Sequence, residues 1–208
     1  MNRRQWLLAG LPPLGLGGCV SIGTGADLPI HAHHLLTDPG AAATTARAAP
    51  LVPALLIQPL PSDALADTVS IAYSRQPNQF AFYQFSSWTE RPVRQIPRLL
   101  QRRLEARGLA AAVGLLGEPL RADWLLTTAI DTLHHDVADP PGHGRVALTV
   151  ELFDRRQRRR LARQQFASDV TTSTADAGAA TRAMSQALSQ TFDVLLPWLE
   201  GSLQRATA

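Results

Sequence analysis

Apolar positions recur along the chain with two different periods, and the changes of period mark its strands and helices. Residues 51–60 form an almost unbroken apolar run between prolines, which is typical of a buried strand. Residues 69–74 and 79–85 alternate apolar and polar positions around Pro77-Asn78, which predicts a hairpin with an aromatic second strand. A shorter strand is predicted at residues 34–36, before the turn-forming sequence Asp38-Pro39-Gly40.

Helical spacing replaces this alternation after Trp88. Thr89 is the expected N-cap, Pro92 fits a first turn that needs no N–H, and Gly108 suits the C-cap. The apolar stripe predicts core packing, and the Arg-rich opposite face predicts a solvated surface, with an acidic partner as the alternative. The stripe consists of Val93, Ile96, Leu99, Leu100 and Leu104.

The second half of the chain repeats the order of strands followed by a helix. A short strand is expected at 110–116, and strands at 123–132, 146–152 and 160–171 have links short enough for an antiparallel meander. The last element has apolar residues at helical spacing, with Thr174 or Asp176 as its cap and Pro197 expected to kink or divide it. The sequence therefore predicts an α+β fold, in which one domain over residues 32–205 packs a mostly antiparallel sheet with two main amphipathic helices.

The first 31 residues show neither period. A basic start and a short apolar stretch lead into Leu16-Gly17-Gly18-Cys19, which resembles the bacterial lipoprotein signal. Small residues would let a peptidase reach the backbone in front of Cys19, and we expect the Cys19 thiol to carry a diacylglycerol. We expect residues 1–18 to be a signal peptide and residues 19–31 to be a lipidated N-terminus and flexible tether. A free thiol in an N-terminal helix is disfavoured by the many prolines and glycines of the leader.

The leader also bears on the destination of the protein. Arg3-Arg4 before an apolar pair resembles a twin-arginine export signal, and an ordinary basic region is the alternative; both lead to export. The apolar stretch is shorter than the roughly 20 residues of a membrane span, so we expect an anchored protein that does not cross the bilayer. Val20-Ser21, with no Asp behind Cys19, favours the outer membrane with the domain facing the periplasm.

Composition excludes several functions. Arg3 and Arg4 leave with the leader and no acidic residue does, so the formal charge of +3 falls to +1, which gives no argument for nucleic acid. The sequence contains no lysine, which excludes a P-loop lysine and Schiff-base chemistry. Its one cysteine, once acylated, leaves no thiol for a disulfide or a nucleophile. We expect no cofactor other than the covalent lipid on Cys19.

Histidines supply the best candidates for metal or acid–base chemistry. Residues 31–34 contain three histidines without a Cys or acidic partner at helical or turn spacing, so a strand is the preferred interpretation. His134 and His135, with His143 nearby, would point to opposite faces of a strand and could not share one ligand set. No metal site is therefore expected.

No catalytic motif accompanies these residues. The chain has no Gly-x-Ser-x-Gly or His-Glu-x-x-His sequence, so we expect a protein that is not an enzyme; a hydrolase with a convergent Ser/His/Asp site is an alternative. Five arginines within residues 155–160 form the densest run of charge. A solvated hairpin tip is the preferred interpretation, and anionic lipid headgroups or an acidic protein are the alternatives.

Arg75, residues 80–85, Trp88, Pro92 and the helix around residues 99–104 stand in an order similar to that of the ABC-type transport auxiliary lipoproteins. The likeness covers most of the mature chain, although His34 stands where a Tyr is common. The resemblance implies an α+β periplasmic domain on a lipid anchor. It would work beside the permease and ATPase of an ABC transporter and an MCE-domain protein, moving lipids between the two membranes without catalysis.

Two points remain open after this resemblance. An outer-membrane assembly or secretion accessory lipoprotein is the alternative function. If the protein binds a partner, we expect the contact surface at the aromatic hairpin; a core role for the same side chains is the preferred interpretation. These side chains are Phe80, Phe82, Tyr83, Phe85 and Trp88.

Overall fold

Strand β6 (Trp124–Asp136) is the centre of the sheet. A computed structural model of the chain describes residues 30–207, so Cys19, the expected signal peptide and nearly all of the expected tether lie outside the described residues. One edge of β6 pairs along its whole length with β7 (His143–Asp154), and β7 pairs with β8 (Arg159–Thr171), both antiparallel. The predicted meander is thus confirmed.

The other edge of β6 is shared by two parallel neighbours. Its first half pairs with β2 (Val52–Pro59), which also pairs with β5 (Ala110–Leu115), while its last residues pair with β3 (Ser70–Gln76). Strand β4 (Gln79–Trp88) is antiparallel to β3 as predicted, and β1 (Ala32–His34) adds to β4 in parallel. The result is one α+β domain with an eight-stranded mixed sheet, whose longest pairings are antiparallel.

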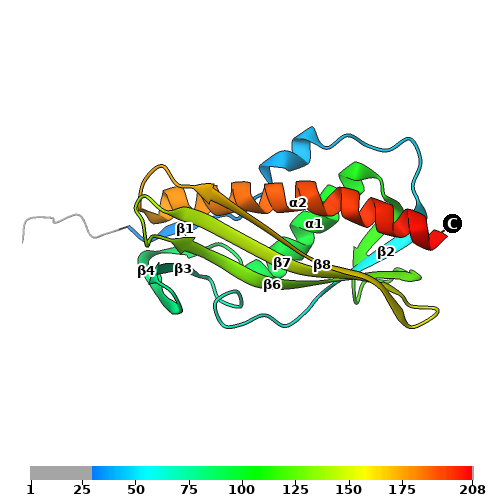
Figure 1. Cartoon of the computed structure of the whole chain (residues 1–208), viewed down its shortest axis with the longest axis horizontal. Helices are drawn as coiled ribbons and strands as arrows, with labels where there is room; N and C mark the ends of the chain where they lie inside the picture. Colours follow the sequence, from blue (N-terminus) through cyan, green and yellow to red (C-terminus); the bar gives the residue numbers. More distant parts are fainter. Residues whose placement is uncertain (1–29, 208) are drawn as a thin grey trace, which may run out of the picture. The chain divides into compact units, whose positions relative to one another are not determined.

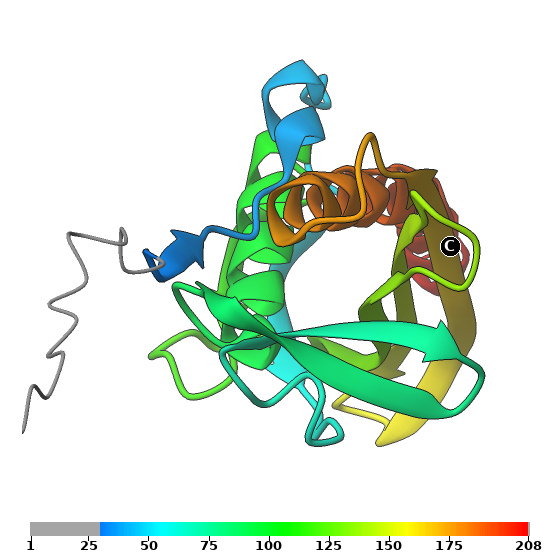
Figure 2. The ribbon, with the colours of Figure 1, turned by 90° about the vertical axis from the view of Figure 1, so that its left-hand side faces the viewer.

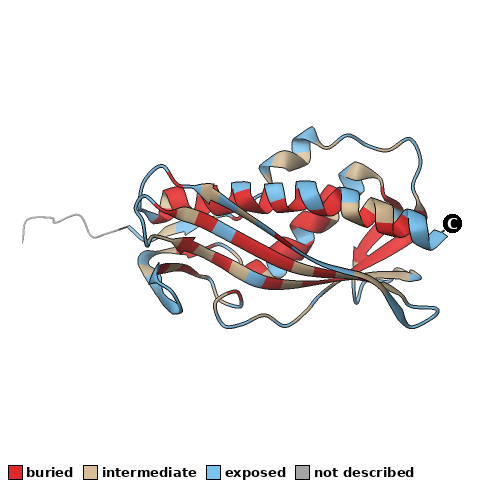
Figure 3. Cartoon of the chain, in the orientation of Figure 1, coloured by how far each residue is buried: buried red, intermediate tan, exposed pale blue. Residues whose placement is uncertain are grey.

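Two helices cover one face of this sheet (Figure 1). Helix α1 (Pro92–Arg107) packs against β5 and β2, and helix α2 (Ala177–Thr207) packs against β7 and β8. Buried residues follow the sheet and the sides of the helices that meet it (Figure 3). The largest fully buried apolar side chains include Leu55, Ile71, Leu100, Leu148 and Phe192. No helix among residues 30–207 has the length and apolar character needed to cross a membrane.

The ends of the elements differ in places from their predicted positions. Gly108 terminates α1 with a φ of 68°, as expected of a C-cap, but the N-cap is Arg91 and not Thr89. Pro92 occupies the first turn as expected. Helix α2 continues through Pro197 to Thr207 as one element, so the proline does not divide it, and the helix packs against β7 and β8. Its start is capped by Asp176, whose Oδ1 accepts a hydrogen bond from the Ala179 N–H at 2.9 Å.

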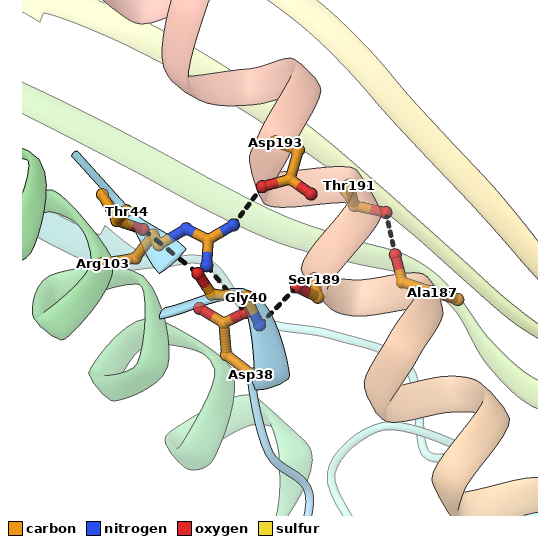
Figure 4. A network of polar contacts seen from close by, with 8 residues as sticks. All are labelled: Asp38, Gly40, Thr44, Arg103, Ala187, Ser189, Thr191 and Asp193. Carbon is orange, nitrogen blue, oxygen red and sulfur yellow. Dashed lines mark hydrogen bonds and ion pairs between the residues drawn. The ribbon is translucent and has the colours of Figure 1, made fainter. Parts of the chain in front are cut away.

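The segment that connects β1 to β2 crosses both helices, and we call residues 36–49 the strap. It contains the short 3₁₀ helix η1 (Pro39–Ala43), where the sequence predicted a turn; β1 itself lies two residues earlier than predicted. Figure 4 shows how the strap is fastened. The buried guanidinium of Arg103 contacts Asp38 of the strap at 3.3 Å and Asp193 of α2, and Gly40 N–H donates to Ser189 at 2.9 Å.

Candidate functional site at the hairpin end

The β3–β4 hairpin lies at the end of the domain where β1 begins, and the C-terminus lies at the other end (Figure 1). Figure 2 looks onto this end, with the hairpin running across it. Phe80, Phe82 and Phe85 are 45%, 47% and 45% exposed, which is unusual for side chains of this size. They are three of the seven large exposed hydrophobic residues between residues 31 and 207. The predicted surface aromatics are therefore present for these three positions.

Trp88 differs from this prediction. Only 3% of its surface is exposed, and it belongs to the hydrophobic core. The reason is its place in the sheet, since Trp88 pairs with His34 of β1 while its backbone N–H donates to Val69 at 2.7 Å. A core role is correct for Trp88, which is not available as a partner surface in this structure.

Tyr83 is half-buried and belongs to a polar network that extends into the core. Its hydroxyl lies 2.7 Å from Nδ1 of His135, a fully buried side chain on β6. His135 Nε2 lies 3.1 Å from the carbonyl oxygen of Pro141 and 3.3 Å from Oγ1 of Thr172. A carbonyl oxygen only accepts, so Nε2 carries the proton of a neutral imidazole and Tyr83 donates to Nδ1.

The ionisation of this pair agrees with that assignment. Burial, the largest cause, raises the pKa of Tyr83 to about 12, so its hydroxyl keeps its proton. Burial is also the main cause that lowers the pKa of His135 from 6.5, only partly opposed by the hydrogen bond to Pro141. The pair is therefore a neutral, fixed support for the Tyr83 ring at neutral pH.

The turn between β6 and β7 completes this support. Gly142 has a φ of 93°, and a Cβ there would lie 2.3 Å from the Asp136 carbonyl oxygen and 2.8 Å from Nε2 of His135. Only glycine fits so close to both groups. The turn is thereby held against His135, and it presents Val137, Ala138 and Pro140 toward the hairpin.

Between the hairpin and this turn lies an open cavity of about 620 Å³, which we call the hairpin pocket. The Tyr73 and Tyr83 rings lie 4.9 Å apart, and the Arg75 guanidinium lies 5.4 Å from the Tyr73 ring. Arg75 is the one charged side chain that the described part of the chain contributes to the lining. The pocket is lined by Tyr73, Arg75, Phe82, Tyr83, Gln84, Val137, Ala138, Pro140 and Ala175.

The histidines do not converge on one site. The His134 and Phe80 rings are nearly perpendicular with centroids 5.1 Å apart, whereas His135 contacts Tyr83. Nδ1 of His143 lies 3.5 Å from a carboxylate oxygen of Asp169. His31 and His33 both hydrogen-bond to the hydroxyl of Ser87. Across residues 30–207, no three His, Cys, Asp or Glu side chains are grouped so that they could hold a metal ion.

The arginine run occupies the turn between β7 and β8, far from the hairpin (Figure 1). Arg160 lies 3.0 Å from Glu151, and Arg156 lies 3.7 Å from Asp123. The side chains of both arginines are more than half exposed. This agrees with a solvated hairpin tip whose arginines are partly neutralised by their neighbours.

Sequence reasoning missed two groups that organise the domain. The Tyr83–His135 pair depends on the parallel contact of β3 with β6, for which the sequence carries no local signal. Arg103 had a signal, because it lies three residues after Leu100 and seven after Ile96, on the apolar stripe of α1. A charged residue at such a position predicts a buried ion pair.

A mixed sheet with both helices on one face and an aromatic hairpin at one end define a small domain of the α+β class. The chain belongs to the family of ABC-type transport auxiliary lipoprotein components, whose family model matches residues 34–194. The resemblance found in the sequence is thus confirmed. The family description associates the chain with ABC-type transport and with lipoproteins.

Solved structures show the same fold. Protein XCC0632 from Xanthomonas campestris is 22% identical with a TM-score of 0.73, and the match covers 84% of this chain and 98% of that one. An uncharacterised protein is 12% identical with a TM-score of 0.64, over 82% of this chain and 99% of that one. No curated protein sequence matches the chain. At these identities the likeness extends to the fold alone.

Proposed function

We propose that this protein is a non-catalytic auxiliary subunit of an ABC transporter that works with an MCE-domain protein to move lipids between the inner and outer membranes. The family match over residues 34–194 is the observation that carries this proposal. A diacylglycerol on Cys19 anchors the domain to the outer membrane, and the domain faces the periplasm. This arrangement suits a subunit that links the transporter to the opposite membrane.

The exposed hairpin is the proposed contact with the MCE-domain protein. Its three phenylalanines offer apolar surface at an end of the domain, and aromatic side chains are enriched in protein interfaces. Tyr83 and Trp88 attach the hairpin to the rest of the domain. Tyr83 does so through His135, and Trp88 does so through its place in the core.

Affinity capture from membranes tests this function. The lipidated protein is purified after cross-linking, and the co-purifying proteins and lipids are identified by mass spectrometry. We expect permease, ATPase and MCE-domain protein with the wild type, and loss of the MCE-domain protein with Phe80, Phe82 and Phe85 all changed to Ser. The matched control changes the exposed Leu116 and Val194 to Ser. Recovery of outer-membrane assembly factors in place of transporter components would contradict the proposal.

The anchor has its own test. Cys19→Ser is expressed behind the cleavable signal of a soluble periplasmic protein, which removes any anchoring by an uncleaved leader. We expect the variant in the soluble periplasmic fraction with an unchanged melting temperature, and the wild type in the outer-membrane fraction. Full membrane retention of the variant would refute the anchor.

A further inference from the structure

We propose that the hairpin pocket binds an amphiphile, with the anionic head beside Arg75 and the start of the acyl chain against Tyr73, Phe82 and Tyr83. This deepens the proposed function by naming a lipid-binding site on the auxiliary subunit. The head is a carboxylate or a phosphate, because both suit a guanidinium.

Charge selects an anion. Among residues 30–207, Arg75 is the only charged side chain that lines the pocket, and no carboxylate lines it. Asp176 follows the lining residue Ala175, but its carboxylate accepts hydrogen bonds from Thr174 and from the Ala179 N–H at the start of α2. The carboxylate is thus engaged at the helix N-terminus, where a negative charge is stabilised. After burial, the charge of Asp176 is the largest cause that raises the pKa of Tyr83, and it outweighs Arg75 there. The anionic head is therefore placed at Arg75, and the apolar chain at Tyr83.

The walls select an apolar group beside that anion. The ring centroids of Tyr73 and Tyr83 lie 4.9 Å apart. Phe82 also lines the pocket, and 47% of its surface is exposed. The volume of about 620 Å³ lies within the usual range for a small-molecule site. An inorganic anion would leave this aromatic surface in water, whereas an acyl chain covers it.

The pocket is also rigid before any ligand binds. The Tyr83 ring is fixed through its hydrogen bond to His135, a side chain with no exposed surface. The opposite wall is fixed by Gly142, which lets the β6–β7 turn lie against the same histidine. A preformed site loses little conformational entropy on binding, which favours a ligand with few polar contacts.

The membrane that holds the lipid anchor would be the source of the amphiphile. The β3–β4 hairpin, which lines the pocket, lies at the end of the domain where β1 begins, and 11 residues lie between Cys19 and His31. The tether expected from the sequence would, at this length, span on the order of 20 Å. The pocket would therefore stay close to the membrane that holds the anchor, and this step alone rests on the proposed function.

Ligand binding is measured on the mature Cys19→Ser chain, by calorimetry below the micelle concentration of each ligand. The probes are dodecanoate, dodecyl phosphate and the neutral 1-monolauroylglycerol. We expect both anions to bind, with the tighter one identifying the head group, and the neutral lipid to bind at least about 10-fold more weakly. Arg75→Gln should weaken anion binding about 10-fold and leave the neutral lipid unchanged.

Two further variants complete the test. Arg94→Gln, on the exposed face of α1, removes one positive charge elsewhere and should bind all three probes as the wild type does. Ala138→Trp fills the pocket and should abolish binding of every probe, with folding verified by its melting curve. The proposal is overturned by equal anion binding in the Arg75 and Arg94 variants, by equal binding of the neutral lipid, or by undiminished binding in the filled pocket. Capture of transporter components without anion binding overturns the pocket alone, and anion binding without such capture overturns the proposed function alone.

Discussion

Removing the positive charge of Arg103 should destabilise the domain more than any change on its solvated surface. The Arg103 side chain is 2% exposed, and it joins α1 to the strap and to α2 through Asp38 and Asp193 (Figure 4). In Arg103→Met the side chain keeps similar bulk but leaves the carboxylate of Asp38, which is 1% exposed, without its cation. Oδ2 of Asp38 already lacks a hydrogen-bond partner among the described residues.

The structure sets the size of this effect. Breaking a buried ion pair by removing one partner costs about 3–5 kcal/mol, because the remaining charge stays buried and uncompensated. Loss of the contact with Asp193 adds little to this free-energy cost, since the Asp193 side chain is 59% exposed and water can replace the arginine. For a domain of this length the loss corresponds to a melting temperature lower by roughly 6–20 °C.

Denaturant unfolding followed by circular dichroism measures the free energy of unfolding of this variant. Arg98→Met is the matched control on the same helix, because Arg98 is half exposed and lies 3.6 Å from Glu90. It should change stability by less than about 0.5 kcal/mol. Arg103→Met combined with Asp38→Asn should recover part of the loss, because the stranded charge is gone. A loss below about 1 kcal/mol in Arg103→Met would refute the idea that the pair fastens the strap.

Other parts of the domain give three further predictions. Tyr83→Phe should cost about 1–3 kcal/mol by leaving Nδ1 of buried His135 without a donor, measured by urea unfolding. Because the pKa of His135 is lowered in the folded domain, the unfolded chain binds this proton more readily as the pH falls. The contribution of His135 to the free energy of unfolding is therefore full above pH 6.5 and is lost as the pH falls below that value. Melting curves from pH 7.5 to 5 check this, and a melting temperature that does not change with pH contradicts it. Gly142→Ala should lower the melting temperature, because its Cβ would strike the Asp136 carbonyl, whereas Gly201→Ala within α2 should not.

Two more histidines contribute to the same pH profile. His34 and His134 also have a lowered pKa, chiefly through burial, so they add to the loss of stability in acid. His135→Gln should therefore reduce the slope between pH 6.5 and 5 without abolishing it. A slope equal to that of the wild type would remove His135 as a cause.

Local chemistry decided a large part of the fold before any tertiary contact. Alternation placed β3, β4 and the three strands of the meander, since a strand with one buried face needs a period of two. Gly108 ended α1 because a left-handed C-cap favours glycine. The lone cysteine after a short leader predicted the anchor, and the order of the elements indicated the family.

Long-range pairing decided the rest. The sequence predicted each neighbour of β6 as a strand, but not that β2 and β3 pair in parallel with the same edge of β6. Parallel strands are not joined by a short turn, so no local sequence signal identifies the pairing. The contact of β3 with β6 places Tyr83 on His135 and forms the hairpin pocket, whereas Trp88 is buried where β4 pairs with β1, and three phenylalanines of β4 stay exposed. The sequence by itself thus determined which segments form strands and helices. Which side chains contact one another, and therefore where the hairpin pocket forms, depended on which strands pair in the folded sheet.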